Sequence, residues 1–209
     1  MTHSKFKPQQ LAALALLLFA VGLGLFLLLT THIPVPVASS PEVTFTRGMI
    51  AHHTQAITMA LMIRQRSNDR TIRSAALDIQ LSQEEQIRQM RGFLKLWKQP
   101  DTFPMSADHA RRMGMASDAE LRLLNTLPVS QAEVEFLQLM IRHHQGALRM
   151  IPPALEPGVL PQVRHLARQM QVVQGGEIRF MTSLLRARGA NLLPFPELKM
   201  DLNMPGMEH

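Results

Sequence analysis

The chain has 209 residues and a formal net charge of +6, with 15 methionines and 9 histidines but no cysteine. The lack of cysteine excludes a disulfide framework, a cysteine-ligated zinc or iron–sulfur site, and thiol catalysis. The mild basic excess is spread along the chain without a lysine or arginine run, so we expect no nucleic-acid partner. Thioether and imidazole remain as soft ligands and together suit Cu(I), although methionine also fills irregular helical cores.

The first predicted element is an apolar helix near the N-terminus. The range Leu11–Leu29 is a run of 19 uncharged residues, all apolar or glycine, and such a helix rises roughly 28 Å, close to the thickness of a bilayer core. A signal peptide is the alternative to an uncleaved anchor. Lys5 and Lys7 precede the run, so the positive-inside rule places the bulk of the chain outside the cytoplasm. We predict a cytoplasmic N-terminus at 1–10, a transmembrane anchor at 11–31 and a proline-rich stalk at 32–41.

An internal duplication organises the rest of the chain. Residues 39–94 match residues 130–185 at 18 of 56 ungapped positions, with an offset of 91. The identities include two histidine pairs and the methionines around them. We therefore predict one domain at 42–189 that consists of two related halves, followed by a tail at 190–209 that contains methionine and histidine.

Each half is expected to contain two helices. Ser-x-x-Glu sequences at Ser39–Glu42 and Ser130–Glu133 resemble capping boxes, and apolar residues follow them with the helical period. The second helices are expected over 70–97 and 160–188, and no stretch alternates like a strand. Two helical hairpins that bury their apolar stripes against each other predict an all-α four-helix bundle with a pseudo-two-fold axis.

Paired histidines lie at the border of the buried stripe in both halves. Helical spacing gathers His52 and His53 with Met49 and Met59 on one side of the first helix. The second half repeats this set, and the partner helices add inward methionines, so the further candidate ligands are Met140, His143, His144, Met150, Met90 and Met181. A repeated set of thioethers and imidazoles favours a metal or active site, while histidines that only form hydrogen bonds in the core are the alternative. Such donors favour Cu(I), and imidazole alone also accepts Cu(II) or Zn(II).

A di-iron site is the main rival for an inward-facing metal centre. It needs several carboxylates, commonly from all four helices of a bundle. Inward acids are scarce here: Glu177 is the best placed, its repeat partner is Gln86, and Glu84 lies nearby. We therefore expect iron less than copper.

A second group of soft donors lies outside the duplicated helices. Ser117 and Glu120 form a capping box in the segment that joins the halves, so a short helix is expected there. Met105, His109 and Met113 in the same segment are spaced four residues apart. With Met115 and the tail residues Met204, Met207 and His209, they form a secondary set of candidate metal ligands.

Three motifs resemble the signatures of the domain of unknown function 305 family. They are Met49-Ile50-Ala51-His52-His53 with Ala56 and Met59, Met140-Ile141-Arg142-His143-His144-Gln145-Gly146-Ala147 with Met150, and Gln174-x-x-Glu177-Ile178-x-x-Met181. Met113-Gly114-Met115 resembles the family's usual Met-Gly-Met element. The resemblance implies a ferritin-like bundle in a bacterial protein that is exported or membrane-tethered, with copper binding and copper tolerance in some members. Gln86 departs from the pattern, because Glu is usual there.

These observations lead to one functional hypothesis with two alternatives. We expect a membrane-anchored protein, in the periplasm or at the cell surface, that sequesters or transfers Cu(I) through histidine and methionine, with no catalytic residues. Its partners are metal ions, the membrane and a copper-handling protein, and zinc or iron is the less favoured ion. The alternatives are a ferritin-like metal oxidase and a structural or interaction module without metal.

Overall fold

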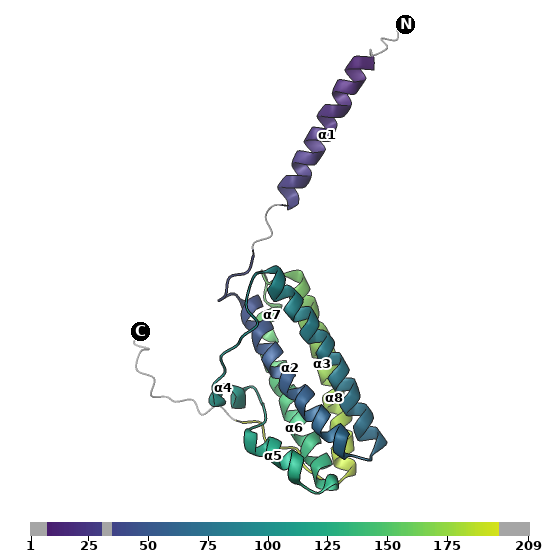
Figure 1. The fold of residues 1–209 in the computed structure, drawn as a ribbon, viewed down its shortest axis with the longest axis vertical. Helices are drawn as coiled ribbons and strands as arrows, with labels where there is room; N and C mark the ends of the chain where they lie inside the picture. The colour runs from purple at the N-terminus through teal and green to yellow at the C-terminus, as the bar shows by residue number, and fades with distance from the viewer. Residues whose placement is uncertain (1–7, 31–34, 197–209) are drawn as a thin grey trace, which may run out of the picture. The chain divides into compact units, whose positions relative to one another are not determined.

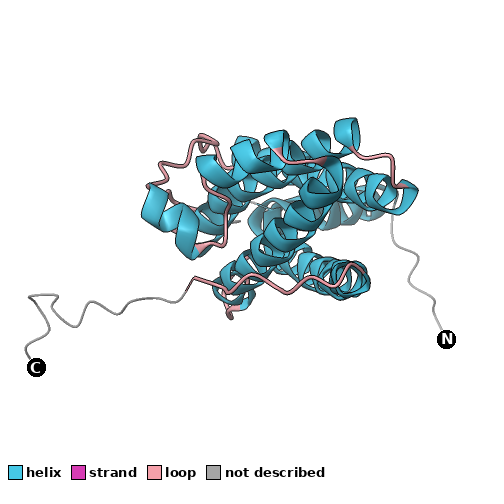
Figure 2. Cartoon of the chain, turned by 90° about the horizontal axis from the view of Figure 1, so that it is seen from below, coloured by secondary structure: helices cyan, strands magenta, loops and turns pink. Residues whose placement is uncertain are grey.

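The computed structural model of the protein describes residues 8–30 and 35–196. Within these ranges every regular element is a helix and none is a strand, which confirms the all-α prediction (Figure 1). Figure 2 shows the same helices joined by loops. In chain order the helices are α1 Pro8–Thr30, α2 Pro41–Arg66, α3 Arg70–Leu96, α4 Ala107–Arg112, α5 Asp118–Thr126, α6 Val129–Met150, α7 Pro152–Leu155 and α8 Pro161–Ala187.

The helix α1 belongs to a compact unit that ends at Val35, and all other helices belong to a unit that begins at Pro36. Leucine and phenylalanine side chains of α1, such as Leu16 and Phe19, are exposed. Among the residues that the structure describes, no helix has the length and apolar character needed to cross a membrane. The structure therefore shows a helix where we predicted the anchor at 11–31, but it does not support membrane anchoring.

The first hairpin consists of α2 and α3, which are joined by residues 67–69. Ser40, one residue after the predicted cap, is the N-cap of α2, and its Oγ accepts a hydrogen bond from the Val43 N–H at 3.4 Å. Pro41 takes the first helical position, where a missing N–H removes no helical hydrogen bond. The predicted cap at Ser39 was wrong because proline favours a start at the next residue.

The second hairpin consists of α6 and α8. Its second helix spans nearly the predicted range of 160–188, and Gly189, with a φ of 68°, follows it as a left-handed stop. Pro128 precedes α6 and no side chain caps that helix. Ser130 is instead the second residue of α6, so the predicted capping box in this half was wrong.

The two glutamates of the predicted capping boxes join one half of the domain to the other. Glu42 accepts a hydrogen bond from the Leu160 N–H at 3.1 Å, directly before α8. Glu133, its repeat equivalent, accepts from the Ser67 hydroxyl at 2.6 Å, close to the start of α3. Each glutamate therefore contacts the residues that precede the second helix of the opposite half.

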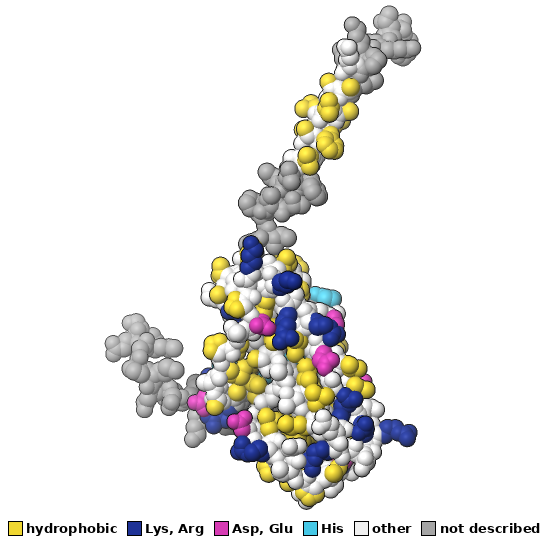
Figure 3. Space-filling view, viewed as in Figure 1, with side chains coloured by type: hydrophobic (Ala, Val, Ile, Leu, Met, Phe, Trp, Pro, Cys, Tyr) yellow, Lys and Arg dark blue, Asp and Glu magenta, His cyan; other side chains and the backbone are white. Residues whose placement is uncertain are grey.

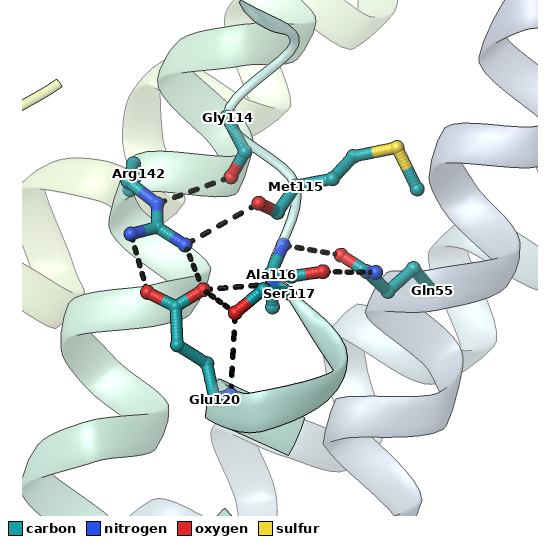
Figure 4. A network of polar contacts seen from close by, with 7 residues as sticks. All are labelled: Gln55, Gly114, Met115, Ala116, Ser117, Glu120 and Arg142. Carbon is teal, nitrogen blue, oxygen red and sulfur yellow. Dashed lines mark hydrogen bonds and ion pairs between the residues drawn. The ribbon is translucent and has the colours of Figure 1, made fainter. Parts of the chain in front are cut away.

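The segment between the halves contains α4 and α5. Ser117 caps α5, and its reciprocal hydrogen bonds with Glu120 confirm the predicted capping box. We call residues 113–120 the connector; they run from the end of α4 into the first turn of α5 and contact both α2 and α6 (Figure 4).

The four long helices α2, α3, α6 and α8 enclose two apolar clusters. The α5-side cluster contains Ala56–Ile63 of α2 and Leu124 of α5, and the α7-side cluster contains Val43–Ile50 of α2 and Ala154 of α7. Both clusters draw on all four long helices, so the two hairpins share one interior. The ferritin-like class of this packing stays a prediction.

Candidate metal centre

A layer of polar side chains separates the two apolar clusters. Each long helix contributes two residues at the point along its length where one cluster ends and the other begins. We call this set the polar layer: His52 and His53 of α2, Gln83 and Gln86 of α3, His143 and His144 of α6, and Gln174 and Glu177 of α8. Each member from the first half has an equivalent 91 residues later in the second half, as His52 has in His143. The duplication therefore supplies the same layer from both halves.

The polar layer is almost entirely shielded from solvent. The four histidines are 0 to 1% exposed, and Gln83 and Gln174 are each 1% exposed. Glu177 is the most accessible member, with 19% of its side chain exposed. On the face drawn in Figure 3, little histidine reaches the surface. The sequence placed the histidines at the border of the buried stripe, and the structure places them fully inside it.

The second histidine of each pair is anchored in the same way in both halves. Nε2 of His53 lies 2.7 Å from Oε1 of Gln86, and Nε2 of His144 lies 2.8 Å from Oε2 of Glu177. Both oxygens accept, so the proton of each imidazole is on Nε2. The two halves differ at this contact only in that one acceptor is a carboxamide and the other a carboxylate.

The first histidine of each pair lies where α2 meets α6. The rings of His52 and His143 are in contact but tilted, with centroids 3.6 Å apart and an angle of 31° between their planes. His52 donates from Nε2 to the Met113 carbonyl at 2.9 Å. Neither ring nitrogen of His143 has a hydrogen-bond partner. The pseudo-two-fold symmetry is therefore broken at these two rings.

The polar layer holds most of the buried polar atoms that lack a partner. Of the eleven such side-chain atoms in the described residues, all but those of Thr46 and Arg164 belong to the layer. They include Nδ1 of all four histidines and both amide atoms of Gln83 and Gln174. Buried polar atoms normally have partners, so nine unpartnered atoms in one layer need an explanation.

Three imidazoles of the layer are held in the neutral state by burial. Burial lowers the pKa of His52 from 6.5 to about 3 and that of His53 from 6.5 to about 4. Burial and the neighbouring imidazoles also lower the pKa of His143 well below 6.5. With Nε2 protonated in His52 and His53, Nδ1 of each ring carries a free lone pair, which is the form that binds a metal ion.

The methionines predicted as ligands lie in the apolar clusters on either side of the layer. Met59, Met140 and Met181 belong to the α5-side cluster, and Met49 and Met90 belong to the α7-side cluster. Met150 is half-buried against the α7-side cluster. Packing accounts for these positions, and a ligand role for the thioethers stays a prediction. In the part of the chain that the structure describes, no three His, Asp or Glu side chains are grouped to hold a metal ion.

The secondary donors of the segment between the halves do not form one helical face. The helix α4 covers only Ala107–Arg112, so Met105 precedes it and Met113 is its C-cap. Of the three residues spaced four apart, only His109 lies within α4. His109, Met113 and Met150 instead line one pocket of about 330 Å³, together with Arg112 and Arg149. Met115 is half-buried in the connector, and Met204, Met207 and His209 lie outside the described residues.

The connector is fixed against the layer by a polar network, drawn in Figure 4. Arg142 of α6 forms a bidentate ion pair with Glu120, with N···O distances of 2.8 and 2.9 Å. Gln55 of α2 pairs with the Ala116 backbone, accepting from its N–H at 2.7 Å and donating to its carbonyl at 2.9 Å. These contacts position the neighbouring Met113 carbonyl opposite His52.

Gly146 of α6 allows the connector to approach the layer this closely. A Cβ atom at this position would lie 1.7 Å from the Met113 carbonyl oxygen. Gly114 has a φ of 72°, and a Cβ atom there would lie 2.4 Å from the Arg142 carbonyl oxygen. Glycine at these two positions is therefore a steric requirement of the connector's path.

A family comparison matches most of the domain that carries this layer. The family described as a domain of unknown function (DUF305) matches residues 42–185. The chain belongs to the DUF305 family. Among curated proteins, this DUF305 chain is 42% identical over 50 residues to an uncharacterised protein of Acanthamoeba polyphaga mimivirus, and that match covers 24% of this chain and 33% of the viral protein.

Solved structures of DUF305 proteins are similar over nearly their whole length. A DUF305 fragment from Deinococcus radiodurans is 54% identical, with a TM-score of 0.69, and the match covers 73% of this chain and 99% of the fragment. The "putative secreted protein DUF305" from Streptomyces coelicolor is 39% identical, with a TM-score of 0.70, over 76% of this chain and 98% of its own.

CopM in its Cu(I)-bound and Cu(II)-bound forms is a more distant neighbour. The identities are 27% and 26%, and the TM-scores are 0.59 and 0.60. Each match covers 71% of this chain, with 96% and 97% of the CopM chains. A fold of this kind is therefore associated with copper in at least one similar protein.

Sequence reasoning missed three parts of this DUF305 site. Gln83 and Gln174 were not identified as site residues, although their repetition in the middle of an apolar stripe was a usable signal. Gln86 was noted only as a departure from the family pattern, and the structure makes it the partner of His53. The Met113 carbonyl had no sequence signal, because every residue has a carbonyl.

Proposed function

We propose that this DUF305 protein binds copper as Cu(I) in the polar layer and sequesters it or transfers it to a copper-handling partner. The proposed ligand atoms are Nδ1 of His52, His53 and His144, together with His143. Thioethers of Met49, Met59, Met140 and Met150 are additional candidates, because they lie one helical turn or two from the histidines.

The observation that carries this proposal is the set of buried, unpartnered Nδ1 atoms. Metal-binding histidines typically donate the other ring N–H to a carbonyl or carboxylate, which fixes the ring and leaves one lone pair for the metal. His52, His53 and His144 each have this arrangement, with a backbone carbonyl, a carboxamide and a carboxylate as acceptors. A site of neutral imidazoles with thioethers nearby suits a soft monovalent ion.

This arrangement also assigns a supporting role to Glu177. The sequence makes Glu177 the best-placed acidic candidate for a metal ligand, but its Oε2 is engaged with Nε2 of His144. We propose that it orients His144 and raises the basicity of that ring instead of binding the ion directly. The remaining donors, His109, Met113 and Met115 included, stay secondary candidates.

The two alternative functions draw less support from the described residues. A ferritin-like oxidase needs several carboxylates around its metal ions, and the polar layer contains one, Glu177. A scaffold without metal would leave nine buried polar atoms of the layer to be satisfied by internal water. Copper-bound CopM, which is similar in fold, adds weight to the copper proposal.

We further propose that the protein acts outside the cytoplasm. The arrangement of charge before the apolar N-terminal helix supports this location, and the similar Streptomyces coelicolor protein is named as a secreted one. Fractionation of cells that express the tagged full chain tests the location, and recovery in the cytosolic fraction would contradict it.

Metal retention by the purified full chain tests the copper proposal. Cu(I), Ag(I), Zn(II) and Fe(II) are added separately under anaerobic conditions, and bound metal is measured after desalting. The variant carries asparagine at the four layer histidines, and the control carries His165→Asn, a change at an exposed residue of α8. We expect the parent and control to retain Cu(I) and Ag(I) and the layer variant to lose them.

A second measurement keeps the test valid if the layer variant does not fold. In the parent, 15N resonances of histidine report each ring nitrogen separately. Addition of Ag(I) is expected to shift Nδ1 of at least one layer histidine and leave Nε2 nearly unchanged. Equal retention by parent and folded variant, or Nδ1 resonances unaffected by Ag(I), would remove the layer from the proposal.

A further inference from the structure

The contact of the second histidine has the same geometry in both halves of the polar layer, but the acceptor differs in charge. His53 donates to the carboxamide of Gln86, and His144 donates to the carboxylate of Glu177, across contacts that differ by 0.1 Å. Carboxamide and carboxylate are nearly the same size and shape. The halves therefore offer a metal ion similar donors in two different electrostatic environments.

Glu177 is the only acidic residue in the polar layer. The other members are four histidines and three carboxamides, so the two halves of the layer differ in formal charge only at this position. Among the described residues, no lysine or arginine forms an ion pair with Glu177, and its contact is with His144.

An ion that enters the layer leaves water and needs a compensating charge. Transfer of an unpaired charge into a protein interior is strongly unfavourable, and a paired charge is tolerated. A monovalent ion in the half with Glu177 gives a neutral layer. A second monovalent ion in the half with Gln86 would leave the layer with a net positive charge and no counter-ion.

From this difference we infer that the second half of the layer retains the ion and that each chain holds one monovalent soft cation tightly. Gln86 makes the first half a weak site, and Glu177 selects where the ion is bound. Both are positioning residues that act through His53 and His144. This inference rests on the proposed copper function and specifies its stoichiometry, its location and the charge of the preferred ion.

The simpler reading is that both residues only hold a histidine ring in place. In that reading Gln and Glu are interchangeable, because both accept a hydrogen bond from Nε2. An exchange of these two residues between the halves therefore separates a steric role from an electrostatic one.

The experiment is a titration of the full chain with Ag(I), in competition with a chromophoric chelator. The proteins are the parent, Glu177→Gln, Gln86→Glu and the double exchange of both residues. We expect one tight ion in the parent, and a loss of affinity on the order of tenfold or more in Glu177→Gln, as is typical when the partner of a ligating histidine is removed. Gln86→Glu is expected to gain a second tight ion.

The double exchange identifies the position of the ion. It should again bind one ion. Ag(I) should shift the Nδ1 resonance of His144 in the parent and that of His53 in the double exchange. Circular dichroism confirms that each variant is folded.

Two outcomes would overturn this inference while the copper proposal stands. They are two equally tight ions in the parent, or an affinity that Glu177→Gln does not change. A folded parent that binds neither Ag(I) nor Cu(I) would instead overturn the proposed function itself.

Discussion

The two halves of the domain share a sequence pattern, but the connector contacts them differently. In the first half Gln55 pairs with the Ala116 backbone, and His52 donates to the Met113 carbonyl. The repeat equivalent of Gln55 is Gly146, which has no side chain and leaves space for the same connector. A duplicated hairpin has two copies and a single connector, so the connector necessarily breaks the symmetry and makes the two halves of the polar layer unequal.

Low pH should cause the largest effect, because it acts on the buried histidines. In the unfolded chain His52 and His53 titrate near 6.5, and burial lowers the pKa of each in the folded chain to about 3 and about 4. Below pH 6.5 the unfolded state therefore binds protons that the folded state does not. The contribution of these histidines to the free energy of unfolding is therefore complete above pH 6.5. It decreases by roughly 3 kcal/mol per histidine as the pH falls to about 4.

Urea unfolding between pH 7.5 and 4 measures this loss. The double variant His52→Asn and His53→Asn should have a shallower pH dependence than the parent, whereas His165→Asn, at an exposed position, should not. A parent stability that does not change over this range would contradict the buried, neutral state of the first-half pair.

Gly146→Ala should displace the connector from its position against α6. The Cβ of Gly146→Ala would lie 1.7 Å from the Met113 oxygen, so the connector must move and the His52 hydrogen bond must lengthen. We expect a loss of about 3 kcal/mol in the free energy of unfolding. Thermal and urea denaturation measure this change.

Gly92→Ala is the matched control for that prediction. Gly92 is also within a helix, but a Cβ there has no atom within 4 Å. This change should be neutral or stabilising by up to about 1 kcal/mol. Similar losses in both variants would mean that helix propensity, and not the connector, explains the effect.

The ion pair of Arg142 and Glu120 should have a smaller effect than the backbone contact at Gly146. Burial alone would raise the pKa of Glu120, but hydrogen bonds from Arg142 and Ser117 lower it to about 2. Arg142→Met leaves this carboxylate and two connector carbonyls without their donor, and we expect a loss of about 2 kcal/mol.

A double-mutant cycle with Glu120→Gln measures the coupling between these two side chains. The exposed pair of Arg88 and Glu85 on α3 is the control, and we expect no measurable coupling there. Equal coupling energies at the two pairs would show that the connector is not held by Arg142.

The smallest predicted difference concerns the starts of the two first helices. Ser40→Ala removes the side-chain cap of α2 and should lower the free energy of unfolding by about 1 kcal/mol. Ser130→Ala, within the first turn of α6, removes no cap and should have no effect. Denaturation curves measured in parallel test the pair, and a greater loss in the second variant would contradict the observed caps.

Much of the fold was predictable because helices follow local rules. The second helices were expected over 70–97 and 160–188 and occur at Arg70–Leu96 and Pro161–Ala187. The Ser117 and Glu120 capping box was also predicted correctly. The predicted capping boxes at Ser39 and Ser130 were wrong. Their glutamates, Glu42 and Glu133, form hydrogen bonds with the opposite half instead. Contacts between the halves cannot be recognised from the four residues of a capping motif.

The candidate site was only partly predictable for the same reason. The histidine pairs were found because repetition and helical spacing place them on the inner side of each hairpin. The spacing of Met105, His109 and Met113 did not reveal that α4 contains only His109, and their role as ligands stays a prediction. The membrane anchor was inferred from hydropathy alone, and the described helices do not support it.

The sequence by itself determined that this protein is a duplicated all-helical chain with buried histidine pairs, since a period of 3.6 residues and an offset of 91 are visible in one dimension. Only the tertiary structure decided which atoms of those histidines are free. The contact between the rings of His52 and His143, and the hydrogen bond from His52 to the Met113 carbonyl, join residues that are far apart in the chain. Such contacts depend on how the connector packs across both halves, and packing of that kind is a property of the assembled helices.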